Sequence, residues 1–166
     1  MILYVDASSI VALHLNERER HPILIELKER SDSIITSRVS YAQARAAFAR
    51  IRRDPDRRPV MTQSRYDAAV QALDSDWSTY IRVAVSEDLV QEAGRLTGEH
   101  PLKGFDAIQL ASALTVLQTL SDEFRFSTGD RSLSRAAQEA PPSVVARTPL
   151  SPAAYPVWVF PGKWTA

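Results

Sequence analysis

The chain has 166 residues, of which 45% are hydrophobic and 24% charged, and its formal net charge is zero. This length and composition are typical of one globular domain, and the zero net charge argues against strong general affinity for nucleic acid. The absence of cysteine excludes a disulfide framework and a thiolate metal site. No apolar run reaches the roughly 20 residues that a membrane-spanning helix needs, and no basic segment precedes the first apolar run. We therefore expect a cytoplasmic protein without membrane segments.

The first half of the chain alternates short apolar runs with segments of helical spacing. Apolar runs predict strands, and serine caps or a proline in the first turn indicate where helices begin. In chain order we expect a strand at 2–5, a helix capped by Ser8 or Ser9, a helix from Pro22, a strand at 33–37, a helix from Ser40 to about Arg53, and a helix at 62–77.

The second half continues the same alternation. We expect a strand at 80–85, a helix from Ser86 to Gly98, a helix at 106–120, a strand at 124–127, a helix at 131–139, and a last short strand at 144–145. Alternating strands and helices predict a mostly parallel sheet flanked by helices.

The composition changes near residue 150, and we divide the chain into a domain at 1–150 and a tail at 151–166. Prolines favour an extended backbone in this tail, and its aromatic side chains rarely stay exposed on a monomer. The tail either packs on its own domain or forms a homodimer or partner contact. The aromatic residues are Tyr155, Trp158, Phe160 and Trp164.

Arginines are concentrated in one stretch of the chain. They are Arg45, Arg50, Arg52, Arg53, Arg57 and Arg58. The simpler interpretation is a solvated helix end and loop. The functional interpretation is either a partner contact or part of a track for a phosphate backbone, because arginine binds phosphate with two hydrogen bonds.

Three aspartates stand at boundaries between predicted elements. Asp6 ends the first strand, Asp106 opens an apolar helix, and Asp130 follows the strand at 124–127. Strand ends and the helix starts after them share one edge of an α/β sheet, where ligands bind. Each aspartate alone is better explained as a helix cap, but three together indicate a site for a hard divalent cation.

The residues around these aspartates form recognisable motifs. The segments are Val5-Asp6-Ala7-Ser8-Ser9, Thr36-Ser37, Phe105-Asp106-Ala107-Ile108-Gln109-Leu110-Ala111 and Ser127-Thr128-Gly129-Asp130-Arg131-Ser132-Leu133. Together they resemble the motifs of PIN-domain ribonucleases, and more narrowly those of VapC toxins of toxin–antitoxin pairs. The resemblance extends from residue 1 to about residue 150, and the motif around Asp106 is the strongest.

The resemblance implies a PIN-like three-layer α/β/α fold with four to five strands, and an endoribonuclease that depends on Mg²⁺ or Mn²⁺. It implies that Asp6, Asp106 and Asp130 form the metal site. Ser8 and Thr128 correspond to residues that support the site. Ser37 either hydrogen-bonds near the site or simply ends its strand.

One position departs from the family pattern. The family has a second acid, a glutamate, in the helix after the second strand, and Gln43 occupies this place. Glutamine carries no negative charge and cannot act as a general base. The alternative function is therefore a catalytically impaired PIN module that binds RNA or a protein. A metal-dependent phosphatase or DNA nuclease is a weaker third possibility, and Ala7-Ser8 after Asp6 lacks the second aspartate of haloacid-type phosphatases.

The resemblance also implies partners. These are an RNA substrate, a cognate VapB-like antitoxin whose extended tail lies over the acidic groove, and a second copy of the chain in a homodimer. The tail and the helices between 22 and 53 are the candidate surfaces.

Overall fold

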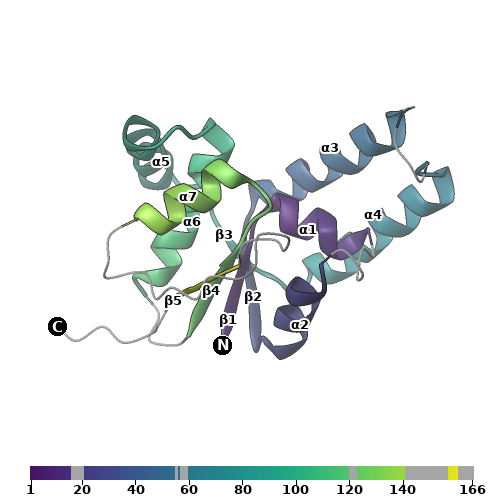
Figure 1. The fold of residues 1–166 in the computed structure, drawn as a ribbon, viewed down its shortest axis with the longest axis horizontal. Helices are drawn as coiled ribbons and strands as arrows, with labels where there is room; N and C mark the ends of the chain where they lie inside the picture. The colour runs from purple at the N-terminus through teal and green to yellow at the C-terminus, as the bar shows by residue number, and fades with distance from the viewer. Residues whose placement is uncertain (16–20, 55, 57–59, 120–122, 141–156, 161–166) are drawn as a thin grey trace.

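The computed structural model describes residues 1–15, 21–54, 56, 60–119 and 123–140, and the backbone of 157–160. One five-stranded sheet forms its centre, with the strands in the order β3-β2-β1-β4-β5 (Figure 1). The first four strands are parallel, and β5 is antiparallel to β4. The strands are β1 (Ile2–Val5), β2 (Ser33–Ser37), β3 (Ile81–Val83), β4 (Phe124–Ser127) and β5 (Val157–Phe160).

Helices cover both faces of the sheet. The first four pack on one face and the last three on the other (Figure 1). The helices are α1 (Ala7–His14), α2 (Pro22–Arg30), α3 (Val39–Arg53), α4 (Gln63–Trp77), α5 (Glu87–Glu99), α6 (Gly104–Leu117) and α7 (Arg131–Glu139). The predicted three-layer α/β/α fold with a mostly parallel sheet is confirmed.

The central strand β1 shows why two cores form. Leu3 and Val5 lie in the core under α1 to α4, whereas Tyr4 between them lies in the core under α5 to α7. Successive side chains of a strand point to opposite faces. Because helices cover both faces, all three side chains are fully buried, which explains the continuous apolar run of this strand.

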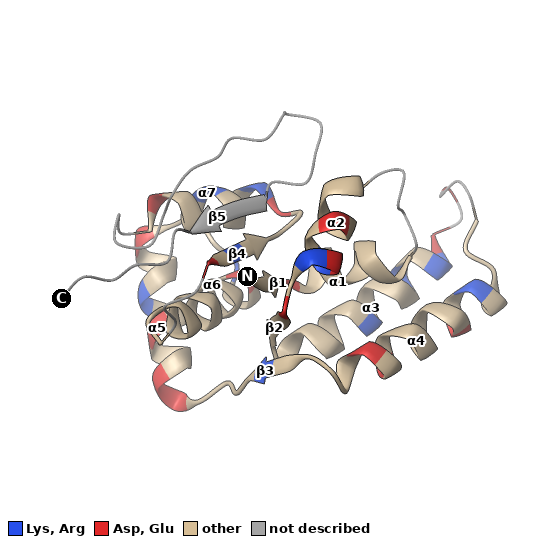
Figure 2. Cartoon of the chain, turned by 90° about the horizontal axis from the view of Figure 1, so that it is seen from below, with Lys and Arg blue, Asp and Glu red and all other residues tan. Residues whose placement is uncertain are grey.

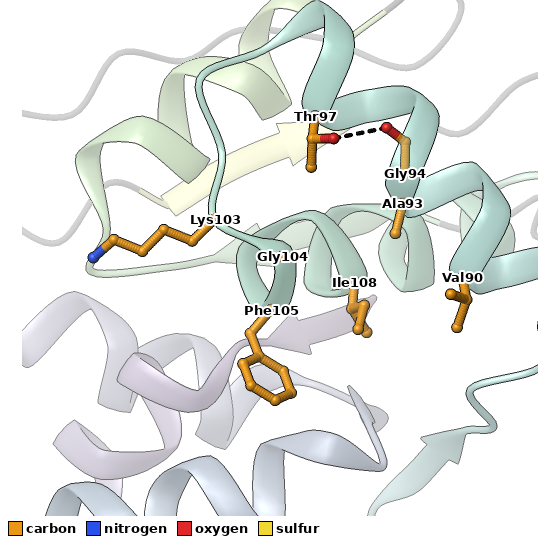
Figure 3. Close-up of a pocket in the computed structure, with 8 residues that line it drawn as sticks. All are labelled: Val90, Ala93, Gly94, Thr97, Lys103, Gly104, Phe105 and Ile108. Carbon is orange, nitrogen blue, oxygen red and sulfur yellow. Dashed lines mark hydrogen bonds between the residues drawn. The ribbon is translucent and has the colours of Figure 1, made fainter.

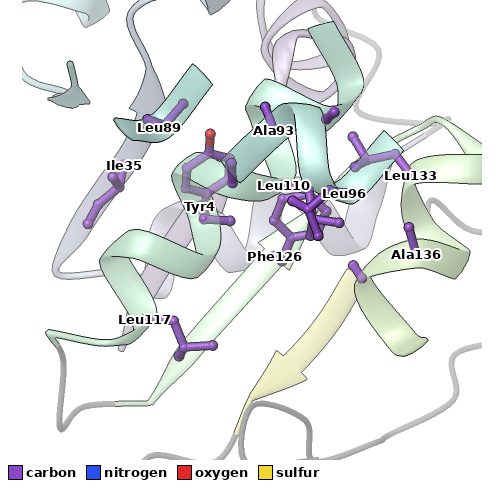
Figure 4. Close-up of a cluster of buried hydrophobic side chains, with 14 of the residues drawn as sticks. Tyr4, Ile35, Leu89, Ala93, Leu96, Leu110, Leu117, Phe126, Leu133 and Ala136 are labelled. Carbon is purple, nitrogen blue, oxygen red and sulfur yellow. The ribbon is translucent and has the colours of Figure 1, made fainter. Parts of the chain in front are cut away.

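The core under α5 to α7 is built on aromatic side chains of the strands (Figure 4). The rings of Tyr4 and Phe126 are stacked with their centroids 5.4 Å apart. Leu110 of α6 and Leu133 of α7 pack against the same cluster. Burying each such side chain contributes about 1.5–3 kcal/mol, so these contacts fix α6 and α7 on the sheet.

Two helix starts differ from the prediction. The first helix is capped by Asp6, whose carboxylate accepts from the Ser9 backbone N–H at 2.8 Å, and not by Ser8 or Ser9. The third helix begins at Val39, and Ser40 lies inside it as a fully buried side chain. The Ser8 hydroxyl is hydrogen-bonded to Asp6 and the Ser40 hydroxyl to Thr36, so neither serine caps its helix.

Two further boundaries also move. The helix predicted from residue 106 begins at Gly104, so that Asp106 lies in its first turn. The strand predicted at 80–85 is shortened to β3, which pairs with β2 alone at the edge of the sheet. Ile81 in this strand is 52% exposed. An edge strand has fewer partners to hold it in register, which accounts for its short length.

The tail contributes an edge strand of its own. The backbone of β5 pairs with the whole of β4, with Trp158 opposite Phe126. This pairing favours the interpretation in which the tail packs on its own domain. The strand predicted at 144–145 lies outside the described residues, and the boundary at 150 stays a prediction. Within the described part of the chain, no helix has the length and apolarity needed to cross a bilayer.

Candidate functional site

The carboxyl ends of β1 and β4 meet at one edge of the sheet, because the two strands are parallel neighbours. Asp6 follows β1 directly, and Asp130 lies three residues after the end of β4. Both act as N-caps, of α1 and α7 respectively. The sequence prediction that these acids stand at strand ends leading into helices is confirmed.

Asp6 is the centre of the hydrogen bonding at this edge. It is only 4% exposed, and its carboxylate accepts from the Ser9 backbone N–H at 2.8 Å, from Ser8 Oγ at 2.7 and 2.9 Å, and from Thr128 Oγ1 at 2.7 Å. Burial raises the pKa of Asp6, and these hydrogen bonds to the charged form oppose that shift.

Ser8 and Thr128 join the loop after β1 to the loop after β4. Ser8 Oγ accepts from the Gly129 backbone N–H at 2.6 Å, and Thr128 Oγ1 accepts from the Asp130 backbone N–H at 3.0 Å. Each hydroxyl also donates to Asp6. The two residues predicted to support the site therefore hold Asp6 and Asp130 in a fixed relation.

Asp106 comes to this edge from α6. It is half-buried in the first turn of that helix. Burial raises the pKa of Asp106, the neighbouring charge of Asp130 raises it further, and Lys103 opposes both. The repulsion shows that Asp106 and Asp130 are close enough to feel each other's charge.

The three aspartates form no ion pairs within the described part of the chain, and Lys103 is a nearby cation that acts on Asp106. Asp130 uses one oxygen to cap α7, accepting from the Leu133 backbone N–H at 2.9 Å. Carboxylates without ion-pair partners at a ligand-binding edge form an acidic site that favours a cation.

The donor atoms suit a hard cation. In the parts of the chain that the structure describes, no three carboxylate or imidazole side chains are close enough to enclose one ion. At most two of the aspartates would then contact an ion directly. Mg²⁺ commonly binds through one or two carboxylates and keeps several waters, so the oxygen donors present fit Mg²⁺ or Mn²⁺.

Gln43 lies on α3 and is half-buried. Its Oε1 accepts from Gln109 Nε2 at 2.8 Å. Ser37 at the end of β2 is fully buried, and its Oγ finds no hydrogen-bond partner among the described residues. Gln43 therefore contacts α6, three residues beyond Asp106, whereas a role for Ser37 in the site stays a prediction.

The sequence interpretation missed Gln109, Tyr4 and Ser40 as polar elements of this region. Gln109 is 1% exposed and hydrogen-bonds to both of the others. A signal was present, because Gln109 is a long polar residue on a mostly apolar helix, three positions after Asp106. Buried polar side chains need partners, which can be identified only in the fold.

An apolar pocket of about 500 Å³ lies between α5 and α6, beside the start of α6 (Figure 3). Phe105, which is 57% exposed, lies at its margin. Among the described residues that line the pocket, Lys103 is the only charged one, and none of the three aspartates is among them. The lining residues are Val90, Ala93, Gly94, Thr97, Lys103, Gly104, Phe105 and Ile108.

Two residues of the arginine-rich stretch are engaged in packing α3 on α4. Arg45 donates to Tyr41 Oη at 2.8 Å and lies 3.9 Å from Asp74. The Arg52 guanidinium lies 5.1 Å from the centre of the Tyr66 ring. Arginine is the only charged residue type on α3, whereas α4 carries one arginine and three aspartates (Figure 2). A phosphate track there stays a prediction.

Comparison with known proteins places this chain in a family. The family model of the PIN domain matches residues 3–139. This chain belongs to the PIN-domain family. Within the family it is of the VapC type, because two VapC ribonucleases of Mycobacterium tuberculosis are 33% identical to it over 115 residues. They are ribonuclease VapC45 of strain CDC 1551 / Oshkosh and ribonuclease VapC49 of strain ATCC 25618 / H37Rv, and each match covers 69% of this chain and 76% of the relative.

A solved structure shares the PIN fold. It is M. tuberculosis VapC20, described as a toxin that cleaves the sarcin–ricin loop, with a TM-score of 0.56 and 18% sequence identity. The superposition covers 81% of this chain and 94% of VapC20. At this identity the likeness concerns the fold alone.

Proposed function

We propose that this PIN-domain protein is an endoribonuclease toxin that hydrolyses RNA phosphodiesters with Mg²⁺ or Mn²⁺ and is inhibited by a cognate VapB-like antitoxin. The observation that carries the proposal is the acidic edge, where Ser8 and Thr128 bind Asp6 to the loop of Asp130 and Asp106 lies beside Asp130. Membership of the VapC type supports the same chemistry.

The three aspartates of the site have different roles. Asp106 and Asp130, both half-buried and without ion pairs to described residues, would hold the cation. When bound, the cation polarises the scissile phosphate and lowers the pKa of its water. Asp6, almost entirely buried, fixes the two loops through Ser8 and Thr128 and adds negative charge to the site.

The proposed inhibition follows from the same charges. Carboxylates without basic partners attract a guanidinium or ammonium group, which competes with a cation for the same oxygens. An extended antitoxin segment that carries such a group would therefore block the site. A homodimer, with the tail or α2 and α3 as candidate surfaces, belongs to the same proposal.

The test is cleavage of a panel of structured and single-stranded RNAs by the purified protein, with Mg²⁺ or Mn²⁺ and with a chelator. Asp6→Asn and Asp106→Asn should each lower the cleavage rate by about 100-fold or more, because several kcal/mol of charge stabilisation is lost. Asp88→Asn is the matched control, since Asp88 is an exposed acid in the first turn of α5.

Equal cleavage by the parent protein, both variants and the chelated sample would contradict the proposal. A parent protein that binds RNA without cleaving it, and that gains cleavage with Gln43→Glu, would instead identify the impaired PIN module as the function.

A further inference from the structure

A buried chain of hydrogen bonds connects the central strand to α3 through α6. The Tyr4 hydroxyl donates to Gln109 Oε1 at 2.8 Å. Gln109 Nε2 donates to Ser40 Oγ and to Gln43 Oε1, both at 2.8 Å. The Gln109 amide therefore uses its oxygen and both of its N–H donors, and Gln109 and Tyr4 are both buried.

The backbone of β1 determines which end of the Gln109 amide faces α3. Thr36 Oγ1 donates to the Val5 carbonyl at 2.6 Å and lies 2.8 Å from Ser40 Oγ. A carbonyl can only accept, so the single proton of Thr36 is committed to Val5. Ser40 must then donate its own proton to Thr36 Oγ1, and Ser40 Oγ accepts from Gln109 Nε2. The nitrogen of Gln109 must face Ser40 and Gln43.

The orientation of Gln43 follows from that of Gln109. Because Gln109 presents a donor, Gln43 must present its oxygen, and its NH₂ group points away from the chain of hydrogen bonds. No described residue accepts from Gln43 Nε2, and this atom is not among the buried polar atoms that lack a partner. The NH₂ group therefore reaches solvent.

The contact between Gln43 and Gln109 connects position 43 to the helix that carries Asp106. Gln109 is three residues beyond Asp106 on α6, so the two side chains share one face of the helix. An amide has one oxygen, and that of Gln43 is already bound. A glutamate at this position would have a second oxygen free for a cation, whereas Gln43 has only N–H donors free.

We propose that Gln109 is a positioning residue, which holds Gln43 so that its NH₂ group donates to a phosphate oxygen of bound RNA and its oxygen is withheld from the cation. The proposal rests on the proposed nuclease function. It assigns to position 43 a role in holding the substrate, in place of the cation-binding role that a carboxylate would have.

Substitutions at position 43 separate the two roles. Gln43→Met removes the donor and should lower cleavage by about 10-fold to 100-fold while leaving Mn²⁺ affinity, measured by titration calorimetry, unchanged. Gln43→Glu should raise Mn²⁺ affinity by about tenfold or more, because Gln109 can donate to one carboxylate oxygen and leave the other free. Gln71→Met is the control, since Gln71 is exposed on α4.

Gln109→Met tests whether Gln109 acts through Gln43. It should lower cleavage about as much as Gln43→Met, and the double variant should show no further loss, because both changes remove one arrangement. Fold integrity is checked by comparing the thermal unfolding of each variant with that of the parent protein. Should Gln109→Met fail to fold, the variants at Gln43 and the spectra of the parent protein decide the proposal.

A measurement without metal or RNA examines the orientation directly. In ¹⁵N NMR spectra of the parent protein, the side-chain NH₂ protons of Gln109 should exchange slowly with solvent and those of Gln43 rapidly. Slow exchange at Gln43, or a loss of Mn²⁺ affinity in Gln43→Met as large as that in Asp106→Asn, would overturn the proposal. Absence of RNA cleavage by the parent protein would overturn the nuclease function, and the spectra and Mn²⁺ titrations would still decide how Gln43 is oriented.

Discussion

At the scale of single residues, the acidic edge stores unfavourable electrostatic energy. Burial raises the pKa of Asp6. Burial and the negative charge of Asp130 raise the pKa of Asp106. Hydrogen bonds from Ser8 and Thr128 offset part of this cost at Asp6. Such strain is expected where side chains are arranged to bind a ligand that the free protein lacks.

Asp106→Asn should therefore stabilise the metal-free protein at neutral pH. A folded-state pKa raised above the unfolded value means that the folded protein binds the proton more tightly, so stability falls as pH rises through that interval. The variant should melt about 2 °C higher than the parent at about pH 7, and the difference should shrink towards about pH 4. Thermal unfolding followed by circular dichroism measures both, and a variant less stable than the parent at neutral pH would contradict the assignment of repulsion.

At the scale of elements, the site depends on where helices begin. Asp6 caps α1 and Asp130 caps α7, so two of the acids serve both the helix and the site. In each case the carboxylate accepts from the backbone N–H three residues later, at 2.8 and 2.9 Å. This double use explains why capping and cation binding could not be separated in the sequence.

Substitutions of Asp130 separate these uses. Asparagine caps helices as well as aspartate does, so Asp130→Asn should keep the stability of the parent and lose RNA cleavage. Asp130→Ala should lose cleavage and also about 1 kcal/mol of stability. Chemical denaturation measures the stability, and equal stability of the two variants would exclude a contribution of the cap.

A second element-scale contact joins α1, α2 and α4. His14 is buried, with Nδ1 2.8 Å from the Ile10 carbonyl and Nε2 3.3 Å from Asp76, which also accepts from Lys28 at 2.6 Å. Burial lowers the pKa of His14, although the Ile10 carbonyl and Asp76 oppose this, and Lys28 adds to the lowering. Burial, the largest of these influences, therefore favours the neutral imidazole.

Stability should consequently fall as the pH is lowered past the ordinary histidine pKa. A lowered folded-state pKa means that the unfolded chain takes up the proton first, so the loss begins near about pH 6.5 and continues towards about pH 5. His14→Gln should flatten this part of the stability profile. Urea denaturation at several pH values provides the comparison, and an unchanged slope in His14→Gln would refute the prediction.

At the scale of the whole molecule, one sheet separates two cores. The core under α1 to α4 contains Leu73, and the core under α5 to α7 contains Leu110. Both side chains are almost completely buried. Because β1 contributes side chains to both cores, neither core can be lost without disturbing the strand that leads into Asp6.

Leu73→Ala and Leu110→Ala should accordingly each lower the free energy of unfolding of the whole domain, which should still unfold in one transition. Each should cost about 2–5 kcal/mol, the range for removing a buried leucine side chain. Calorimetry should show one peak for both variants. Two separate transitions in either variant would mean that the two cores unfold independently.

The sequence by itself determined the order of strands and helices, the mostly parallel sheet and the family motifs around Asp6, Asp106 and Asp130. These features depend on local periodicity and on short segments that are contiguous in the chain. It misplaced the caps of α1 and α3, because hydroxyl side chains with good local capping propensity, at Ser8 and Ser40, are engaged in contacts with distant residues.

Only the tertiary structure decided how the polar groups are paired. The bridge from Ser8 to Gly129 spans 121 positions, and the bond between Tyr4 and Gln109 spans 105. In the sequence, Gln43 is only a neutral residue at a position where the family has a glutamate. In the fold, the backbone carbonyl of Val5, acting through Thr36, Ser40 and Gln109, determines which end of Gln43 faces outward, because each buried hydroxyl has one proton to give.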